Sequence, residues 1–64
     1  MLDAGEVLRP MRKEKGWSLR KTEEKSGINY QTINNIELGK SGATLYVFQK
    51  LLDTFGYKLE VVKK

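Results

Sequence analysis

Uncharged hydrogen-bonding side chains are concentrated in one short stretch of the sequence, NYQTINN, at residues 29–35. It holds three asparagines, one glutamine, one threonine and one tyrosine, and no charged residue occurs between Lys25 and Glu37. Amides and hydroxyls donate and accept hydrogen bonds, but they are weak nucleophiles and bases unless a neighbour activates them. This pattern favours recognition by hydrogen bonding over the making and breaking of covalent bonds.

The side chains that most enzymes use are scarce in this chain. Its 64 residues include no histidine and no cysteine, which removes the commonest general base, the commonest metal ligand and any thiolate or disulfide. Glu23 and Glu24 are adjacent on a predicted helix, so they point roughly 100° apart and do not form a carboxylate pair. We therefore expect no enzyme activity, no metal site and no cofactor.

Most polar side chains of a helix over residues 30–38 lie off the apolar stripe that Ile33 and Ile36 form. They are Tyr30, Gln31, Asn34 and Asn35, with Thr32 nearby. Amides bind adenine at two points and hydroxyls serve as donor or acceptor, whereas carboxylates would repel phosphate. A plain solvated helix is the alternative, but Asn and Thr are poor helix formers for that purpose. The face therefore predicts DNA base recognition.

The net charge of +4 is unevenly distributed along the chain. Residues 1–8 carry −2, residues 9–25 carry +4 and the remainder carries +2. A basic balance favours a polyanionic partner. Many small domains are equally basic for solubility alone, so the charge by itself leaves both explanations open.

Turn residues divide the chain into short segments that must position these side chains. Apolar spacing predicts helices over residues 4–15, 19–25, 30–38 and 45–54. Ser18, Asn29 and Thr44 are good N-caps for the last three. A glycine follows each helix as a stop signal: Gly16, Gly27, Gly39 and Gly56. Pro10 is anomalous in the first helix, where it predicts either a kink or a regular part that begins shortly before it.

In the last eight residues, YKLEVVKK, apolar side chains recur at every second position instead of at helical spacing. Tyr57, Leu59 and Val61 fall on one side, which predicts a short strand with one apolar face. A lone strand leaves its backbone groups unpaired, so we expect it to pair antiparallel with the same strand of a second copy. A frayed or short helical tail is the alternative. The chain is thus divided into a domain at residues 1–56 and a dimerisation tail at residues 57–64.

The length and the first residues of the chain limit the classes of protein to which it can belong. A chain of this size buries roughly 60% of the surface that it exposes when unfolded, so it makes one domain with a marginal core. The start, MLDAGEVL, is acidic and lacks the apolar segment of a secretory signal, and no apolar run is long enough to cross a bilayer. We expect a cytoplasmic protein with no membrane partner.

Three stretches of the sequence resemble the Cro/repressor-type (XRE-type) helix-turn-helix family: LRPMRKEKGWSL, SGINYQTINNIELGK and TLYVFQKLLDTFG. The similarity runs without a gap from about Leu8 to Gly56. Its specific part is a set of residues that fall where the family pattern expects them: Gly27, Ile28, Asn29, Thr32, Ile33, Ile36, Glu37, Gly39 and Lys40. The resemblance implies an all-α fold of four or five helices and a homodimeric transcriptional repressor that binds double-stranded DNA at a pseudo-palindromic operator.

The resemblance also implies roles for individual residues. In the family, residues that open the second helix of the motif touch bases, and the corresponding residues here are Tyr30, Gln31, Thr32 and Asn35. Other residues are candidates for phosphate contacts, although any one lysine could equally be only solvated. They are Ser18, Arg20, Lys21, Asn34, Lys40 and Ser41. Asn34 is expected to be more exposed than the base-contacting set, and to meet a phosphate or a base.

Two further features of the sequence bear on the geometry of the motif. Family members often hold an arginine of the first helix against the glutamate that ends the recognition helix, so Arg12 and Glu37 are expected to pair, the alternative being two ordinary surface charges. Thr22 and Glu23 stand where the family usually has Leu-Ala. We expect either slightly spread motif helices or a pairing of Glu23 with a nearby cation, with Trp17 supplying apolar cover.

Two kinds of regulator fit these features. The ending TFGYKLEV resembles small antitoxins of the HipB type, whose helix-turn-helix body is followed by a dimerisation strand and which also neutralise a toxin protein. A phage or plasmid repressor without a protein partner is the other kind. Either would be cytoplasmic and encoded by a bacterium, a phage or a plasmid.

Overall fold

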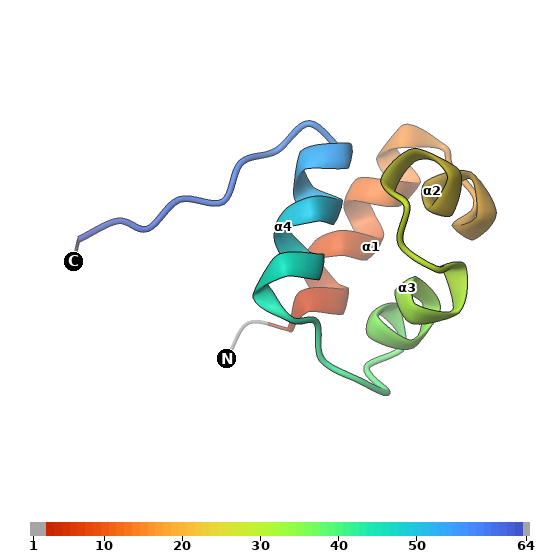
Figure 1. Ribbon diagram of the computed structural model, residues 1–64, viewed down its shortest axis with the longest axis horizontal. Coiled ribbons are helices and arrows are strands. Elements are labelled where there is room, and N and C mark those ends of the chain that lie inside the picture. The colour runs from red at the N-terminus through yellow and green to blue at the C-terminus, as the bar shows by residue number, and fades with distance from the viewer. Residues whose placement is uncertain (1–2, 64) are drawn as a thin grey trace.

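The structure, a computed structural model, describes residues 3–63 and contains four α-helices joined by short turns (Figure 1). They are α1 (Ala4–Lys15), α2 (Leu19–Ser26), α3 (Tyr30–Glu37) and α4 (Leu45–Thr54). None of these helices is long and apolar enough to cross a membrane. The predicted all-α fold class and the four predicted helices are confirmed, and no helix end differs from its predicted position by more than one residue.

Each helix begins after a side chain that accepts a hydrogen bond from the first turn. Ser18 Oγ accepts from the N–H of Lys21 at 3.0 Å, and Thr44 Oγ1 accepts from the third residue of α4 at 3.2 Å. Asp3 Oδ1 accepts from the N–H of Gly5 at 2.9 Å and caps α1, which the sequence pattern had not indicated. These bonds satisfy donors that a helix N-terminus otherwise leaves without a partner.

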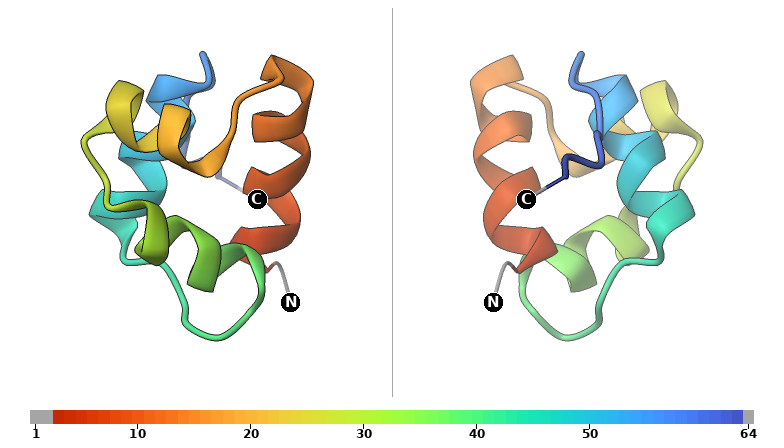
Figure 2. Two further views of the ribbon diagram at one scale, coloured as in Figure 1. Left: turned by 90° about the vertical axis from the view of Figure 1, so that its right-hand side faces the viewer. Right: turned by 90° about the vertical axis from the view of Figure 1, so that its left-hand side faces the viewer.

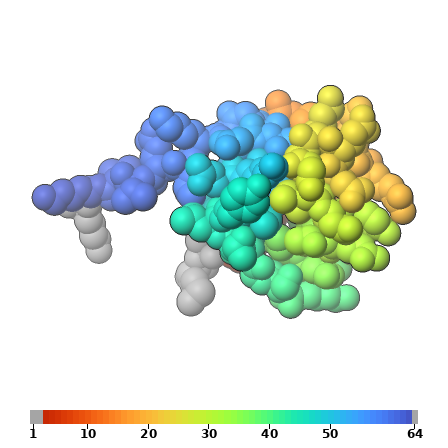
Figure 3. Space-filling view, viewed as in Figure 1, coloured from red at the N-terminus to blue at the C-terminus, as the bar shows by residue number. Residues whose placement is uncertain are grey.

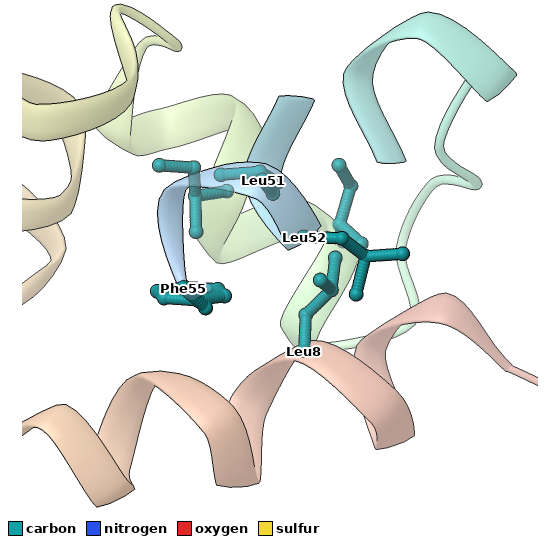
Figure 4. Close-up of a cluster of buried hydrophobic side chains, with 6 residues drawn as sticks. Leu8, Leu51, Leu52 and Phe55 are labelled. Atoms are coloured by element: carbon teal, nitrogen blue, oxygen red, sulfur yellow. The ribbon is translucent and has the colours of Figure 1, made fainter. Parts of the chain in front are cut away.

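The hydrophobic core lies where α1, α3 and α4 meet (Figure 4). Its buried side chains come from these three helices and from the residue after α4: Leu8, Ile33, Ile36, Leu51, Leu52 and Phe55. Trp17, in the turn between α1 and α2, packs against this cluster with its ring centre 5.8 Å from that of Phe55. Because a domain of this size has a marginal core, each of these side chains is a large share of its stability.

Pro10 lies inside α1, which runs from Ala4 to Lys15 without a break in its helical assignment. The regular helix therefore begins six residues before Pro10, at Ala4. Proline lacks the N–H that would bond to the carbonyl of Glu6, one turn earlier. Both residues are exposed, so water can satisfy that carbonyl, and the proline ring does not disturb the core.

The two helices of the predicted motif and the C-terminal tail lie at opposite ends of the molecule. Figure 2 shows α2 and α3 on the side that faces the viewer in one view and the tail on that side in the other. In the space-filling view the tail stands clear of the helical body (Figure 3). The tail of this copy therefore does not cover the surface of α2 and α3.

The tail, residues 57–63, has no regular secondary structure, and no strand occurs in the part of the chain that the structure describes. The predicted strand is therefore not formed by a single copy. The tail begins with a hydrogen bond from the N–H of Tyr57 to the carbonyl of Leu52 at 2.8 Å, and its later side chains, such as Val61 and Val62, are exposed. Pairing with a second copy stays a prediction, because a strand ladder needs a partner edge.

Candidate nucleic-acid interface

The turn between α2 and α3 is fixed by local hydrogen bonds. Gly27 adopts the left-handed conformation, with φ of 79°, and its N–H donates to the carbonyl of Glu23 at 2.8 Å. Ser26 Oγ accepts from the N–H of Ile28 at 3.1 Å, and the side chain of Asn29 caps α3. Glycine reaches this φ without strain. The angle between the two helices is thus set by Ser26, Gly27 and Asn29, the polar and glycine positions of the turn.

Thr22 and Ser26 form the buried polar side of α2, with 0% and 5% of their surface exposed. The hydroxyl of Thr22 donates to the carbonyl of Ser18 at 2.9 Å, so its burial leaves no unsatisfied group. Glu23 is partly exposed and forms no ion pair with any residue between 3 and 63, so its predicted pairing with a cation is not found there. These two small residues, one turn apart, are the buried residues of α2, and Leu19 of the same helix is partly buried and packs against the core.

The polar face of α3 is separated from its apolar stripe. Ile33 and Ile36 are each 1% exposed, whereas Gln31, Thr32 and Asn35 are exposed to solvent. The three exposed side chains carry two amides and one hydroxyl and no charge. The arrangement can offer donors and acceptors together to an external surface.

Tyr30 and Asn34 differ from the other uncharged polar residues of α3 because both are partly buried. The expectation that Asn34 is the more exposed residue is wrong, since Asn35 is exposed and Asn34 is not. Asn34 lies one helical turn from Tyr30 and three residues before Glu37, on a flank of α3 that other parts of the domain cover. The period of a helix does not show which of its two flanks will be covered by neighbouring parts of the domain.

Arg12 of α1 and Glu37 of α3 form an ion pair at two points. Arg12 Nε donates to Oε2 at 2.6 Å and Nη2 donates to Oε1 at 2.9 Å. Arg12 Nη1 also donates to the backbone carbonyl of Trp17 at 2.7 Å. The hydrogen bond with Glu37 raises the pKa of Arg12 above its ordinary value, against the opposing effect of burial. The guanidinium is therefore charged at any pH at which the protein would be studied.

The remaining candidates for phosphate contacts are on the surface around the motif. Ser18, Arg20, Lys21, Lys40 and Ser41 are all exposed. The backbone N–H groups of Lys40 and Ser41 donate to the carbonyl of Asn35, at 2.9 and 3.4 Å, so only their side chains are available to a ligand. Arg20 lies over the ring of Tyr30, with its Cζ atom 4.4 Å from the ring centroid. The structure thus brings together one predicted phosphate contact and one predicted base contact.

Gly5 is a residue of the site's framework that the sequence pattern did not single out. A Cβ atom built on it would lie 2.3 Å from the carbonyl oxygen of Ile36 and 3.0 Å from the Cα atom of Glu37. The backbone of α1 therefore lies directly against the end of α3, as only glycine permits. A glycine inside a helical pattern is the signal that could have indicated this close approach.

Comparison with known proteins places these features in a family. A family model described as helix-turn-helix matches residues 8–62, almost the whole chain. The chain belongs to this helix-turn-helix family, of the Cro/repressor type, which is a family of DNA-binding transcriptional regulators and not of enzymes. The predicted resemblance is thereby confirmed. Neither the curated proteins nor the solved structures that were searched gave a match.

Proposed function

We propose that this protein is a homodimeric repressor that recognises a specific operator by placing α3 in the major groove of DNA. The observation that carries the proposal is the exposed and uncharged polar face of α3, held to the core by Ile33 and Ile36. Such a helix can enter the groove without bringing carboxylates near the phosphates. The one carboxylate of the helix, on Glu37, is engaged by Arg12.

The candidate base contacts are Tyr30, Gln31, Thr32 and Asn35. Gln31 and Asn35 carry amides, which can bind the N6 and N7 positions of adenine at two points. Thr32 can bind a base through its hydroxyl or contact the methyl group of thymine. Support for these three comes from their exposure on one helix at the end of the molecule away from the tail.

The candidate phosphate contacts surround this face: Ser18, Arg20, Lys21, Asn34, Lys40 and Ser41. Contacts of this kind fix the register and orientation of the protein and supply affinity without sequence information. Lys40 and Ser41 follow α3, whereas Arg20 and Lys21 lie on the first turn of α2. Phosphates on both sides of a groove could therefore be bound by one copy.

The dimer is proposed to form through the tail, by Tyr57, Leu59 and Val61. These alternate residues are exposed, and in a single copy the side chain of Val61 is fully accessible to solvent. Antiparallel pairing of two tails would satisfy one backbone edge of each tail and bring their apolar side chains together on one face of the two-stranded ribbon. A two-fold dimer would present two copies of α3 about one helical turn of DNA (roughly 10 bp), or a multiple of it, apart.

Selection of duplexes from a random pool, followed by binding measurements over a range of salt, tests this function. We expect a short palindromic consensus and an affinity that falls steeply as salt rises, because binding releases counterions from the phosphates. Binding that does not depend on salt, or a selected pool without any consensus, would contradict sequence-specific recognition.

A second candidate function is that of an antitoxin, which would bind a partner protein as well as DNA. The observation in its favour is that Leu45 and Tyr46, at the start of α4, are 69% and 67% exposed. Neither the proposed DNA contacts nor the proposed tail pairing uses these residues. Co-expression with the protein encoded next to it tests this: a stable complex that the Leu45→Glu change disrupts supports the antitoxin, and failure to form a complex opposes it.

A further inference from the structure

Arg20 of α2 and Tyr30 of α3 are in contact across the helix-turn-helix unit. The Cζ atom of Arg20 lies 4.4 Å above the centroid of the Tyr30 ring, which is within the range of a cation–π interaction. Arg20 is the second residue of α2 and Tyr30 is the first residue of α3. The contact therefore joins the starts of the two helices that the motif places against DNA.

Arg20 has other anions within reach of its own helix. Glu23 and Glu24 follow it by three and four residues, the spacing at which side chains of a helix meet. In residues 3–63, however, Arg20 forms an ion pair with neither glutamate, and its guanidinium has no hydrogen-bond partner there. The side chain is turned toward the aromatic ring of the next helix instead.

The position of Arg20 over the ring limits how its guanidinium can bind a ligand. The ring covers the side of the guanidinium that faces it, and all five N–H donors of an arginine lie in the plane of that group and point outward from its edge. Two donors on one edge match two oxygens of a phosphate group with parallel hydrogen bonds. An arginine that is already held also loses less rotamer entropy on binding.

We propose that Tyr30 is a positioning residue whose ring holds Arg20 so that the guanidinium binds a phosphate of the DNA backbone. This inference rests on the proposed function and changes the role of Tyr30 within it from base contact to support. Tyr30 is partly buried, whereas Gln31, Thr32 and Asn35 on the same helix are exposed. One face of its ring is occupied by Arg20 and is not available for a base.

Two single variants and their combination test the coupling, with the duplex selected from a random pool as the probe. Arg20→Ala and Tyr30→Leu should each weaken binding about three- to tenfold at low salt, for all duplex sequences alike. The double variant should bind no more weakly than either single variant, because both changes remove the same phosphate contact. Tyr30→Phe keeps the ring and removes only the hydroxyl, so it should bind like the wild type.

The salt dependence distinguishes a lost phosphate contact from a partly unfolded sample. Loss of one contact per copy should reduce the slope of log K against log salt by about 0.9 for each copy bound, hence by about 1.8 for a dimer on its operator, in Arg20→Ala and in Tyr30→Leu. Inactive protein lowers the bound fraction but does not change that slope. Arg20→Ala alters an exposed residue, so it tests the phosphate contact even if Tyr30→Leu proves less stable.

Three results would overturn the inference. Additive losses in the double variant would show that the two side chains act separately, and an unchanged slope in Arg20→Ala would exclude the phosphate contact. A changed base preference at one position in Tyr30→Leu would show that Tyr30 contacts a base. In each case the wild type still binds its operator, so the proposed function stands, whereas a wild type that binds no duplex would overturn both.

Discussion

The guanidinium of Arg12 joins Glu37, the last residue of α3, to the turn that precedes α2. Three of its N–H groups donate, two to the carboxylate and one to the carbonyl of Trp17. The side chains are largely buried, with 13% of Arg12 and 5% of Glu37 exposed. One residue of α1 therefore fixes the end of one motif helix and the approach to the other.

Replacing Glu37 with Ala should destabilise the domain because it leaves the charge of Arg12 largely buried with only the Trp17 carbonyl as partner. We expect the free energy of unfolding to fall by about 2–4 kcal/mol in urea titrations, less than for a charge with no remaining bond. Glu60→Ala is the control, because the Lys58–Glu60 pair spans 3.8 Å and both side chains are well exposed. Its effect should be small; equal effects of the two changes would contradict a structural role for Glu37.

The pH dependence of this pair on the alkaline side follows from the direction of the Arg12 pKa shift. The pKa of Arg12 is higher in the folded state than in the unfolded state. The contribution of the ion pair to stability is therefore fully present at any pH below the unfolded-state pKa. It is lost only as pH rises through the folded-state pKa, which is higher still. That range lies far above neutral pH. The difference in unfolding free energy between wild type and Glu37→Ala should thus be the same at about pH 7 and about pH 9. A difference that shrinks by pH 9 would show that another group controls the pair.

Gly5→Ala should separate α1 from the end of α3. The new Cβ atom would meet the carbonyl oxygen of Ile36 at 2.3 Å, and a backbone atom cannot move aside as a flexible side chain can. We expect a loss of about 1–3 kcal/mol, the range for overpacking, measured by thermal or urea unfolding. Gly42→Ala is the matched control, since nothing lies within 4 Å of its added methyl group and its φ is not positive. It should be neutral or slightly stabilising.

Features set by local sequence were predictable, whereas those set by packing between helices were not. The N-caps Ser18, Asn29 and Thr44 and the glycine stops gave the helix bounds nearly to the residue. The stripe of Ile33 and Ile36 gave the buried face of α3, because helical period alone determines which residues share a face.

The contacts that the sequence did not indicate join residues far apart in the chain. The approach of Gly5 to Ile36 and the placement of Arg20 over the ring of Tyr30 depend on how two helices cross, which no local period encodes. Asn34 was misplaced for the same reason, since a neighbour covers one flank of α3 and not the other. The tail is different in kind, because its predicted strand needs a partner that a single copy does not contain.

Gln31→Ala tests direct base recognition. Loss of a two-point amide contact should cost about 1–3 kcal/mol on the selected operator and relax the preference at one base position. The salt slope should stay unchanged, because no phosphate contact is removed. Gln49→Ala makes the same chemical change at an exposed position of α4 and should leave affinity and preference as they are. If Gln31→Ala weakens all sequences equally, Gln31 does not contact a base.

The alternating pattern of the tail predicts that two adjacent valines differ in their effect on dimerisation. Val61 belongs to the proposed apolar face with Tyr57 and Leu59, whereas Val62 points the other way in a strand. Val61→Asp should therefore shift sedimentation from dimer to monomer, and Val62→Asp, also at an exposed position, should leave the dimer intact. Removal of residues 57–64 should give a folded monomer by sedimentation and circular dichroism. A truncated chain that keeps the mass of a dimer would place the interface elsewhere, and equal effects of both valine changes would exclude a strand with one apolar face.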